Sequence, residues 1–368
     1  MKFALVVGAR PNFVKAAPVL GTLERRGADV VLVHTGQHFD AALSDVFFQR
    51  LCLPKPHYHL GVGAGTRGEQ FGEIVRSLAQ LLPQIKVDEV IVVGDVTSTA
   101  ASAVAADNCD IPLSHVEAGL RSFDLSMPEE RNRKIVDVLA SRHFVSEPSG
   151  VTNLLREGHD PSQIHLVGNV MIDTLFRFRD EARVAAPWLR YGVREQAYAV
   201  ATLHRPNNVD TPEALDEALR MLELVAYRYP VLFSVHPRTA LRLRAFGLSV
   251  PERVRILDPL DYLDFIGLML GARVVLTDSG GVQEETTAMA VPCLTMRENT
   301  ERPITVEKGS SRLIGRSVER VAVLLDEIEA GAFDCGLGIP LWDGKASERI
   351  AEVLLQAKTT NAAHQRKL

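Results

Sequence analysis

Short runs of apolar residues recur in the first half of the chain, and each is followed by a turn and a helical pattern. The runs cover residues 3–7, 30–34, 89–93, 112–116 and 164–167. Strands that are apolar on both faces and alternate with helices are typical of a parallel sheet covered on both sides. The first half therefore predicts a doubly wound α/β domain.

The same rhythm starts again in the second half, after a charged and largely helical connector at 177–195. We therefore predict an α/β protein with two Rossmann-like, doubly wound domains facing a cleft, and a ligand at the carboxyl ends of the strands. The domains are predicted at 1–170 and 171–345. A last helix and tail, 346–368, are expected to pack back on the first domain. The second set of apolar runs covers 198–203, 231–235, 254–257, 273–277 and 292–296.

The composition supports two packed domains and limits the classes of partner that we expect. The 368 residues are 46% apolar and 24% charged, and the net charge is -5. A chain without a basic field is not expected to bind nucleic acid or a membrane surface. The four cysteines lie far apart with no CxxC pair, so neither a zinc site nor a disulfide framework is predicted. The first residues are typical of a buried strand and not of a signal peptide, so we expect a cytoplasmic protein.

Two cations follow the first predicted strand, in the turn GARPNFVK at residues 8–15. The turn fits neither the GxGxxG fingerprint nor the GxxxxGK phosphate loop. A strand that leads into a helix still offers free backbone N–H groups, and Arg10 and Lys15 add charge. We therefore expect an anion such as phosphate here. The alternative is a pair of solvated surface cations.

A stronger phosphate signal lies in TDSGGVQEE, at residues 277–285. Gly280 and Gly281 let a ligand approach the backbone, and the Ser279 hydroxyl lies beside the free N–H groups of a helix start. Glu285 in the first turn could accept hydrogen bonds from ribose hydroxyls. An ordinary serine N-cap with a glycine turn would look similar.

Acidic residues follow consecutive strands of the first half. Asp95 follows one strand, Glu117 follows the next, and Glu129 lies in a predicted loop, MPEERNR. Each alone could be a helix cap or an ion-pair partner, but three at one edge of a parallel sheet indicate acid and base chemistry. His204 ends the first strand of the second half, where a histidine could also take part in catalysis.

The whole set of motifs closely resembles the non-hydrolysing UDP-N-acetylglucosamine 2-epimerases. The motifs run in order from residue 8 to residue 303, so the resemblance covers nearly the whole chain. The chain departs from the family in RPNFVK and HRPNN, where Asn12 and Asn207 replace frequent glutamates. The matching segments are GARPNFVK, TGQHFD, VVGDVTST, HVEAGLRS, MPEERNR, LHR, DPLDYLDF, TDSGGVQEE and TERP.

The resemblance implies a fold like that of the GT-B glycosyltransferases and a homodimer that interconverts UDP-N-acetylglucosamine and UDP-N-acetylmannosamine for surface polysaccharides. In that family the C2 proton is removed and UDP is eliminated, which leaves a 2-acetamidoglucal. Readdition of UDP, with a proton delivered to the opposite face, inverts C2. No metal or redox cofactor is implied, because cations and helix N-termini can neutralise the diphosphate.

The resemblance also implies roles for individual residues. The catalytic group is Asp95, Glu117 and Glu129, with His204 near the diphosphate or the leaving oxygen. The UDP contacts are Arg10, Lys15, Ser279, Gly280, Gly281, Glu285 and Arg302, with Phe265 stacked near the uracil. Some members bind a second UDP-N-acetylglucosamine as an activator, and residues like Gln37, His38 and His236 contribute there. The Arg-Gln pair that helps them is not evident in RGEQFGEI.

Several alternatives stay open at this point. The nearest keeps the site but takes a UDP-2,3-diacetamido uronic acid, for whose carboxylate Arg131 or Arg133 could supply a cation. A hydrolysing epimerase would release N-acetylmannosamine and UDP. A GT-B glycosyltransferase would need an acceptor site and no chemistry at C2, and a catalytically silent sensor would not need the carboxylates. The sequence does not assign the acid and base roles.

Overall fold

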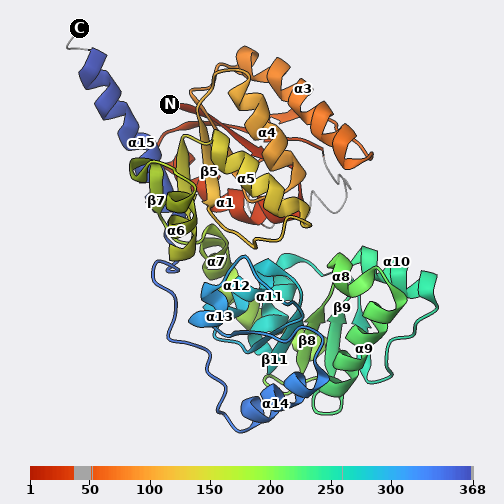
Figure 1. Cartoon of the computed structure of the whole chain (residues 1–368). Helices are drawn as coiled ribbons and strands as arrows, with labels where there is room; N and C mark the ends of the chain where they lie inside the picture. The colour runs from red at the N-terminus through yellow and green to blue at the C-terminus, as the bar shows by residue number, and fades with distance from the viewer. Residues whose placement is uncertain (37–50, 52, 259, 366–368) are drawn as a thin grey trace. The chain divides into compact units, whose positions relative to one another are not determined.

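The computed structural model describes residues 1–36, 51, 53–258 and 260–365. The chain divides into two compact units. The first unit is Met1–Thr174 together with Pro340–Leu368, and the second unit is Leu175–Ile339. Each unit contains one sheet whose paired strands are all parallel (Figure 1). The predicted fold class, with two doubly wound α/β sheets, is therefore confirmed.

The sheet of the first unit has the strand order β3-β2-β1-β4-β5-β6-β7. The order reverses between β1 and β4, and in such sheets the ligand crevice lies outside the carboxyl ends of the strands at this point. The strands are β1 Lys2–Val7, β2 Asp29–His34, β3 Tyr58–His59, β4 Glu89–Val93, β5 Leu113–Ala118, β6 Arg142–Val145 and β7 Ile164–Leu166.

Helices cover both faces of this sheet, because successive strand residues point to opposite sides. Ala4, Val6, Val90 and Val92 face a core shared with α3, α4 and α5, whereas α1 packs on the other face. The helices of this unit are α1 Arg10–Arg25, α3 Arg67–Ile85, α4 Thr97–Asp107, α5 Pro128–Leu139, α6 Pro148–Arg156 and α15 Ala346–Gln365, with a short 3-10 turn η1 Pro161–Gln163. A further helix, α7 Val170–Ala185, begins in the first unit and continues into the second.

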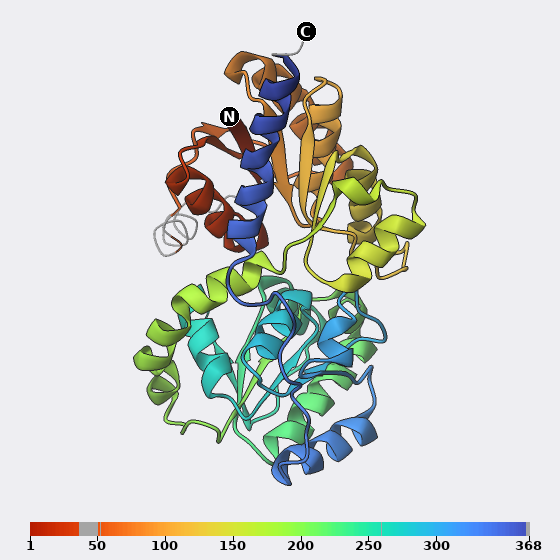
Figure 2. The same ribbon diagram turned by 90° about the vertical axis from the view of Figure 1, so that its left-hand side faces the viewer.

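The last helix belongs to the first unit although it ends the chain. Figure 2 shows α15 in blue alongside α1, on which it packs. Glu348 of α15 pairs with Arg25 at 3.0 Å and with Arg26 at 2.6 Å. The carboxylate of Asp173 caps the start of α15 by accepting from the backbone N–H of Ser347 at 2.7 Å.

The sheet of the second unit has the order β10-β9-β8-β11-β12-β13, with its reversal between β8 and β11. The strands are β8 Ala199–Thr202, β9 Val231–Ser234, β10 Val254–Leu257, β11 Val274–Thr277, β12 Cys293–Thr295 and β13 Ser311–Leu313. The helices are η2 Pro187–Tyr191, α8 Pro206–Val209, α9 Pro212–Ala226, α10 Pro237–Phe246, α11 Tyr262–Gly271, α12 Gly280–Ala288, α13 Ile304–Glu307 and α14 Val318–Glu329.

Two apolar cores enclose this second sheet. Ala201, Phe233 and Leu276 pack on one face with residues of α9 and α14, and Val200 and Val275 pack on the other with residues of α11 and α12. Among the described helices of either unit, none is long and apolar enough to cross a bilayer.

Candidate functional site

Glu117 is placed by an irregularity in β5. The pairing of β5 with β6 shifts register between Val116 and Ala118, so Glu117 is the extra residue of a bulge. Its φ of 74° lies in the left-handed region, which a non-glycine residue adopts at a cost of roughly 1–3 kcal/mol. Bulges redirect side chains and recur beside active sites. The strand is therefore distorted where the predicted catalytic carboxylate sits.

The partner of Glu117 is Lys15 of α1. The Lys15 ammonium contacts the Oε2 of Glu117, and both side chains are almost fully buried. Gly94 makes room for this pair, since a Cβ on it would lie 3.2 Å from the Lys15 Nζ. Nearby, Asn12 donates to the Val93 carbonyl at 2.8 Å. In this structure Lys15 is thus an ion-pair partner inside the first unit and not a solvated cation.

Asp95, at the end of β4, is paired with a buried arginine. The Nε of Arg133 donates to the Asp95 Oδ2 at 2.9 Å, and its Nη1 donates to the Glu130 Oε2 at 2.5 Å. Glu130 is wholly buried and also accepts from the backbone N–H groups of Ser122 and Phe123. Arg133 therefore joins Asp95 to the start of α5.

The prediction that MPEERNR is a loop is wrong. α5 begins at Pro128, so Glu129 and Glu130 lie in its first helical turn, where proline and carboxylates are both favoured. The Glu130 carboxylate is already engaged by Arg133 and by the backbone N–H groups of Ser122 and Phe123. Glu129 is half-exposed and makes no hydrogen bond or ion pair to the described residues, so its carboxylate can meet a ligand.

A buried histidine contacts the backbone next to Asp95, at the end of β4. The ring of His115 lies 2.6 Å from the Asp137 Oδ1 and 2.9 Å from the Gly94 carbonyl oxygen. Burial by itself raises the pKa of Asp137, but His115 and Arg121 outweigh it and lower this pKa to about 2. His115 is thus part of a buried charged network and is not exposed to a ligand.

In the second unit, the predicted phosphate turn opens α12. Ser279 is the N-cap, and its side chain makes no capping hydrogen bond. The first turn of a helix leaves backbone N–H groups without acceptors, so Gly280 and Gly281 offer donors beside a hydroxyl that is not used for capping. A Cβ on Gly280 would lie 2.5 Å from the Arg302 Nη1, so a larger residue there would displace the Arg302 side chain.

His204 follows β8 and is held by Asp278, which follows the neighbouring strand β11. The His204 Nδ1 lies 2.9 Å from the Asp278 Oδ1. Asp278 is fully buried, and it also accepts from the backbone N–H of Arg205 at 2.8 Å and from the Asn208 side chain at 3.1 Å. Burial would raise the pKa of Asp278, but these hydrogen bonds keep it below its ordinary value.

Three arginines gather around one buried carboxylate beside α12. The Glu301 carboxylate contacts Arg302, and it lies 2.6 Å from the Arg297 Nη2 and 3.6 Å from the Arg205 Nη2. Arg302 also pairs with Glu284 at 2.8 Å. Three guanidinium groups against two carboxylates leave one net positive charge, which suits an anionic ligand.

Glu285 and Phe265 are less available than the sequence suggested. Glu285 is buried and accepts a hydrogen bond from the Tyr262 hydroxyl at 2.8 Å. Burial, reinforced by Glu284, raises the pKa of Glu285 to about 7 although the Tyr262 bond lowers it. Phe265 is half-buried and packs against the apolar core beside α11. Their roles toward ribose and uracil stay predictions.

Of the three residues that the resemblance relates to an activator, only His236 is described. Gln37 and His38 lie outside the described residues, as does the side chain of Arg10. His236 caps the start of α10, and its ring lies 5.5 Å from that of His204, between centroids. This histidine is therefore a neighbour of the predicted catalytic histidine.

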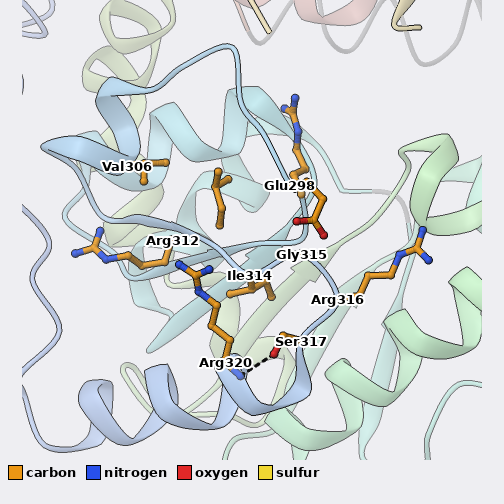
Figure 3. A pocket seen from close by; sticks show the side chains of 10 residues that line it. Glu298, Val306, Arg312, Ile314, Gly315, Arg316, Ser317 and Arg320 are labelled. Atoms are coloured by element: carbon orange, nitrogen blue, oxygen red, sulfur yellow. Dashed lines mark hydrogen bonds between the residues drawn. The ribbon is translucent and has the colours of Figure 1, made fainter. Parts of the chain in front are cut away.

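A cavity of about 680 Å³ opens in the second unit where β12 and β13 end (Figure 3). In the figure, the Arg320 side chain rises from α14 between Arg312 and Ile314, and Arg316 points away from them. None of the residues that the sequence predicted to act lines this cavity, although Arg297 borders it. Three of the predicted acidic and histidine groups lie instead at or just after the carboxyl ends of β4, β5 and β8.

The sequence did not show that three further residues hold the predicted site residues in place. Asp278 was passed over as part of the glycine turn, and Glu130 and Arg133 were not recognised as the network that holds Asp95. A charged residue directly after a mostly apolar strand is the signal that would have found Asp278, because such a residue must be paired when it is buried.

Comparisons with known proteins agree with this geometry. A family model described as UDP-N-acetylglucosamine 2-epimerase matches residues 22–355. A UDP-N-acetylglucosamine 2-epimerase of Methanocaldococcus jannaschii is 37% identical and covers 97% of this chain and 100% of its own. Its crystal structure with UDP-GlcNAc and UDP matches with a TM-score of 0.87.

Two further relatives frame the choice of substrate. A UDP-GlcNAc 2-epimerase of Neisseria meningitidis, bound to UDP-GlcNAc, is 29% identical with a TM-score of 0.89, over 97% of this chain and 100% of its own. A UDP-2,3-diacetamido-2,3-dideoxy-D-glucuronate 2-epimerase of Pseudomonas aeruginosa is 36% identical, over 96% of this chain and 99% of its own. The similarity thus extends over whole chains in both substrate classes.

Proposed function

This chain belongs to the UDP-N-acetylglucosamine 2-epimerase family, and we propose that it interconverts UDP-N-acetylglucosamine and UDP-N-acetylmannosamine without hydrolysis. A carboxylate takes the proton from C2, the bond between C1 and the diphosphate oxygen breaks, and UDP leaves a 2-acetamidoglucal. The diphosphate oxygen then adds back to C1 while C2 receives a proton on its other face.

One observation carries the proposal most directly, the grouping of carboxylates at the strand reversal of the first unit. Glu117 is directed by a bulge and held by Lys15, Asp95 is held by Arg133, and Glu129 is half-exposed in the first turn of α5. Inversion at C2 needs one proton acceptor and one proton donor on opposite faces of the sugar, and a set of carboxylates in different surroundings can supply both.

The second unit supplies the groups that a diphosphate requires. Ser279, Gly280 and Gly281 open α12 with unsatisfied donors, and Arg302 belongs to the arginine cluster around Glu301. His204 faces outward from Asp278, with 35% of its side chain exposed. In the full proposal, Arg10 and Lys15 also serve the UDP, Phe265 stacks near the uracil and Glu285 contacts the ribose.

The uronate substrate is the second candidate, because the Pseudomonas relative is as similar as the others. It would need a cation for the extra carboxylate. Arg133 is buried with its guanidinium on Asp95 and Glu130, so it cannot be that cation without breaking this network. Arg131 is exposed on α5. Of these two arginines, Arg131 is therefore the one that could bind the carboxylate of a uronate substrate.

Proton NMR with UDP-N-acetylglucosamine in heavy water tests the proposal. Deuterium at C2 together with UDP-N-acetylmannosamine is the expected result. An absence of exchange, with turnover of the diacetamido uronate, would transfer the proposal to that substrate. Free N-acetylmannosamine with UDP would mean that hydrolysis wins over readdition.

The proposal also includes a cytoplasmic homodimer that feeds polysaccharide synthesis, and domains that close on the substrate to keep water from the glucal. Sedimentation equilibrium tests the dimer, since a monomer at micromolar concentration would contradict it. Small-angle scattering with and without UDP tests closure, for which unchanged dimensions would count against the proposal.

A further inference from the structure

Asp278 and His204 are joined through both the backbone and the ring of the histidine. The Asp278 carboxylate accepts from the His204 backbone N–H at 3.0 and 3.1 Å, and it lies 2.9 Å from the ring Nδ1. The two residues follow β8 and β11, which pair side by side at the strand reversal. Asp278 is fully buried, whereas 35% of the His204 side chain is exposed.

The hydrogen bond defines the protonation of the ring. An ionised carboxylate can only accept, so Nδ1 must carry a proton. The other nitrogen, Nε2, has no hydrogen-bond partner among the described residues. Because Nδ1 is fixed on the buried side, Nε2 is the nitrogen left for a ligand.

A diphosphate oxygen also accepts and does not donate. A ring that meets it through Nε2 must therefore carry protons on both nitrogens, which makes it an imidazolium. A carboxylate on Nδ1 stabilises that cation and fixes the direction of Nε2, as the aspartate of a serine-protease triad does for its histidine. No covalent bond to the histidine forms or breaks in this arrangement.

We propose that Asp278 is a positioning residue that holds His204 as a doubly protonated ring with Nε2–H directed at the diphosphate oxygen that leaves C1. The inference rests on the proposed function, because it requires a UDP leaving group. The other groups near the ring are His236, whose centroid is 5.5 Å away, and Arg205, whose guanidinium is directed toward Glu301. Neither replaces the carboxylate on Nδ1.

Steady-state kinetics of Asp278→Asn, His204→Gln and the double variant test the coupling. We expect kcat to fall at least about 100-fold in each single variant. In the His204→Gln background, Asp278→Asn should cost less than about 3-fold, because its effect passes through the histidine. A further loss of about 100-fold in that background would overturn the proposal. Wild-type turnover in the same assay tests the proposed function separately.

Asn208→Ala is the matched control for a purely structural role. Asn208 donates to the same carboxylate at 3.1 Å and to the Met296 carbonyl at 2.9 Å. We expect Asn208→Ala to lower the urea midpoint of unfolding while kcat falls much less than in Asp278→Asn. Equal losses of kcat in the two variants would show that Asp278 only supports the loop.

Nitrogen NMR of histidine-labelled protein with UDP reads the ring directly and needs no turnover. The His204 signal is assigned by its loss in His204→Gln. In the UDP complex of the wild type we expect both ring nitrogens to be protonated, and in Asp278→Asn only one. A neutral His204 ring in UDP-bound wild-type protein would overturn the proposal even if the Asp278 variant failed to fold.

Discussion

The guanidinium of Arg133 lies 2.8 Å from the Oδ2 of Asp95. The same guanidinium reaches Glu130, which in turn accepts from the backbone N–H groups of the loop after β5. One buried cation therefore fixes the end of β4, the start of α5 and that loop. The position of Asp95 depends on a residue that has no direct part in the chemistry.

Replacing Arg133 by Met should destabilise the fold by about 3 to 5 kcal/mol, because it leaves two carboxylates without their buried partner. Urea unfolding followed by circular dichroism measures the loss. Arg131→Met is the control, since Arg131 is exposed on the same helix and should change stability by less than about 0.5 kcal/mol. Similar midpoints for the two variants would contradict the buried network.

Lys15→Met should destabilise the protein by about 3 kcal/mol, because Glu117 then stays buried without a countercharge. Adding Glu117→Gln should recover most of this loss, since the neutral amide does not need the ammonium. Unfolding free energies of both single variants and the double variant give the coupling energy. Additive losses would mean that the two side chains do not act as a pair.

Replacing Asp95, Glu117 or Glu129 by the matching amide should lower turnover at least about 100-fold. The C2 exchange assay in heavy water measures it. Glu129 offers the sharpest contrast with Glu130, its neighbour on α5. Glu129→Gln should lose activity at nearly wild-type stability, whereas Glu130→Gln should lower the urea midpoint, because it replaces one buried acceptor oxygen by an NH2 donor and removes the charge that pairs with Arg133. Near-normal rates in all three catalytic variants would remove the proposed set.

Stability should fall as the pH rises from about 4.5 to about 7 because of Glu285. Its folded pKa of about 7 lies above its ordinary value of 4.5, so in this window the unfolded chain ionises while the folded chain keeps the proton. The loss is of the order of 3 kcal/mol at full effect. Unfolding free energies of wild type and Glu285→Gln across pH 4 to 8 measure it. The variant should show a flatter profile, and identical profiles would contradict the assignment.

The long strands were predictable because parallel strands buried on both faces are continuous apolar runs. β4, which is buried throughout, was predicted at the observed residues 89–93. The edge strand β10 was also predicted at the observed residues 254–257, although two of its four residues are exposed. The strands β3, β6 and β13 were missed because they are short or begin with polar residues, and only pairing with a neighbouring strand identifies them.

The site was predictable where a residue lies within two positions of the end of an apolar strand, as Asp95 and His204 do. The sequence could not identify the residues that pair with Asp95 and His204. Arg133 meets Asp95 from 38 positions away, and Asp278 meets His204 from 74 positions away. Such pairs depend on which strands become neighbours, and that order is a property of the folded sheet.

The left-handed backbone of Glu117 sets fold stability and activity against each other at one position. Glycine adopts this conformation without the cost that a glutamate bears. Glycine at position 117 would relieve this backbone cost, but it would leave the Lys15 ammonium buried without its countercharge and would erase the carboxylate. Engineering for higher thermal stability should therefore leave residue 117 unchanged and substitute other positions.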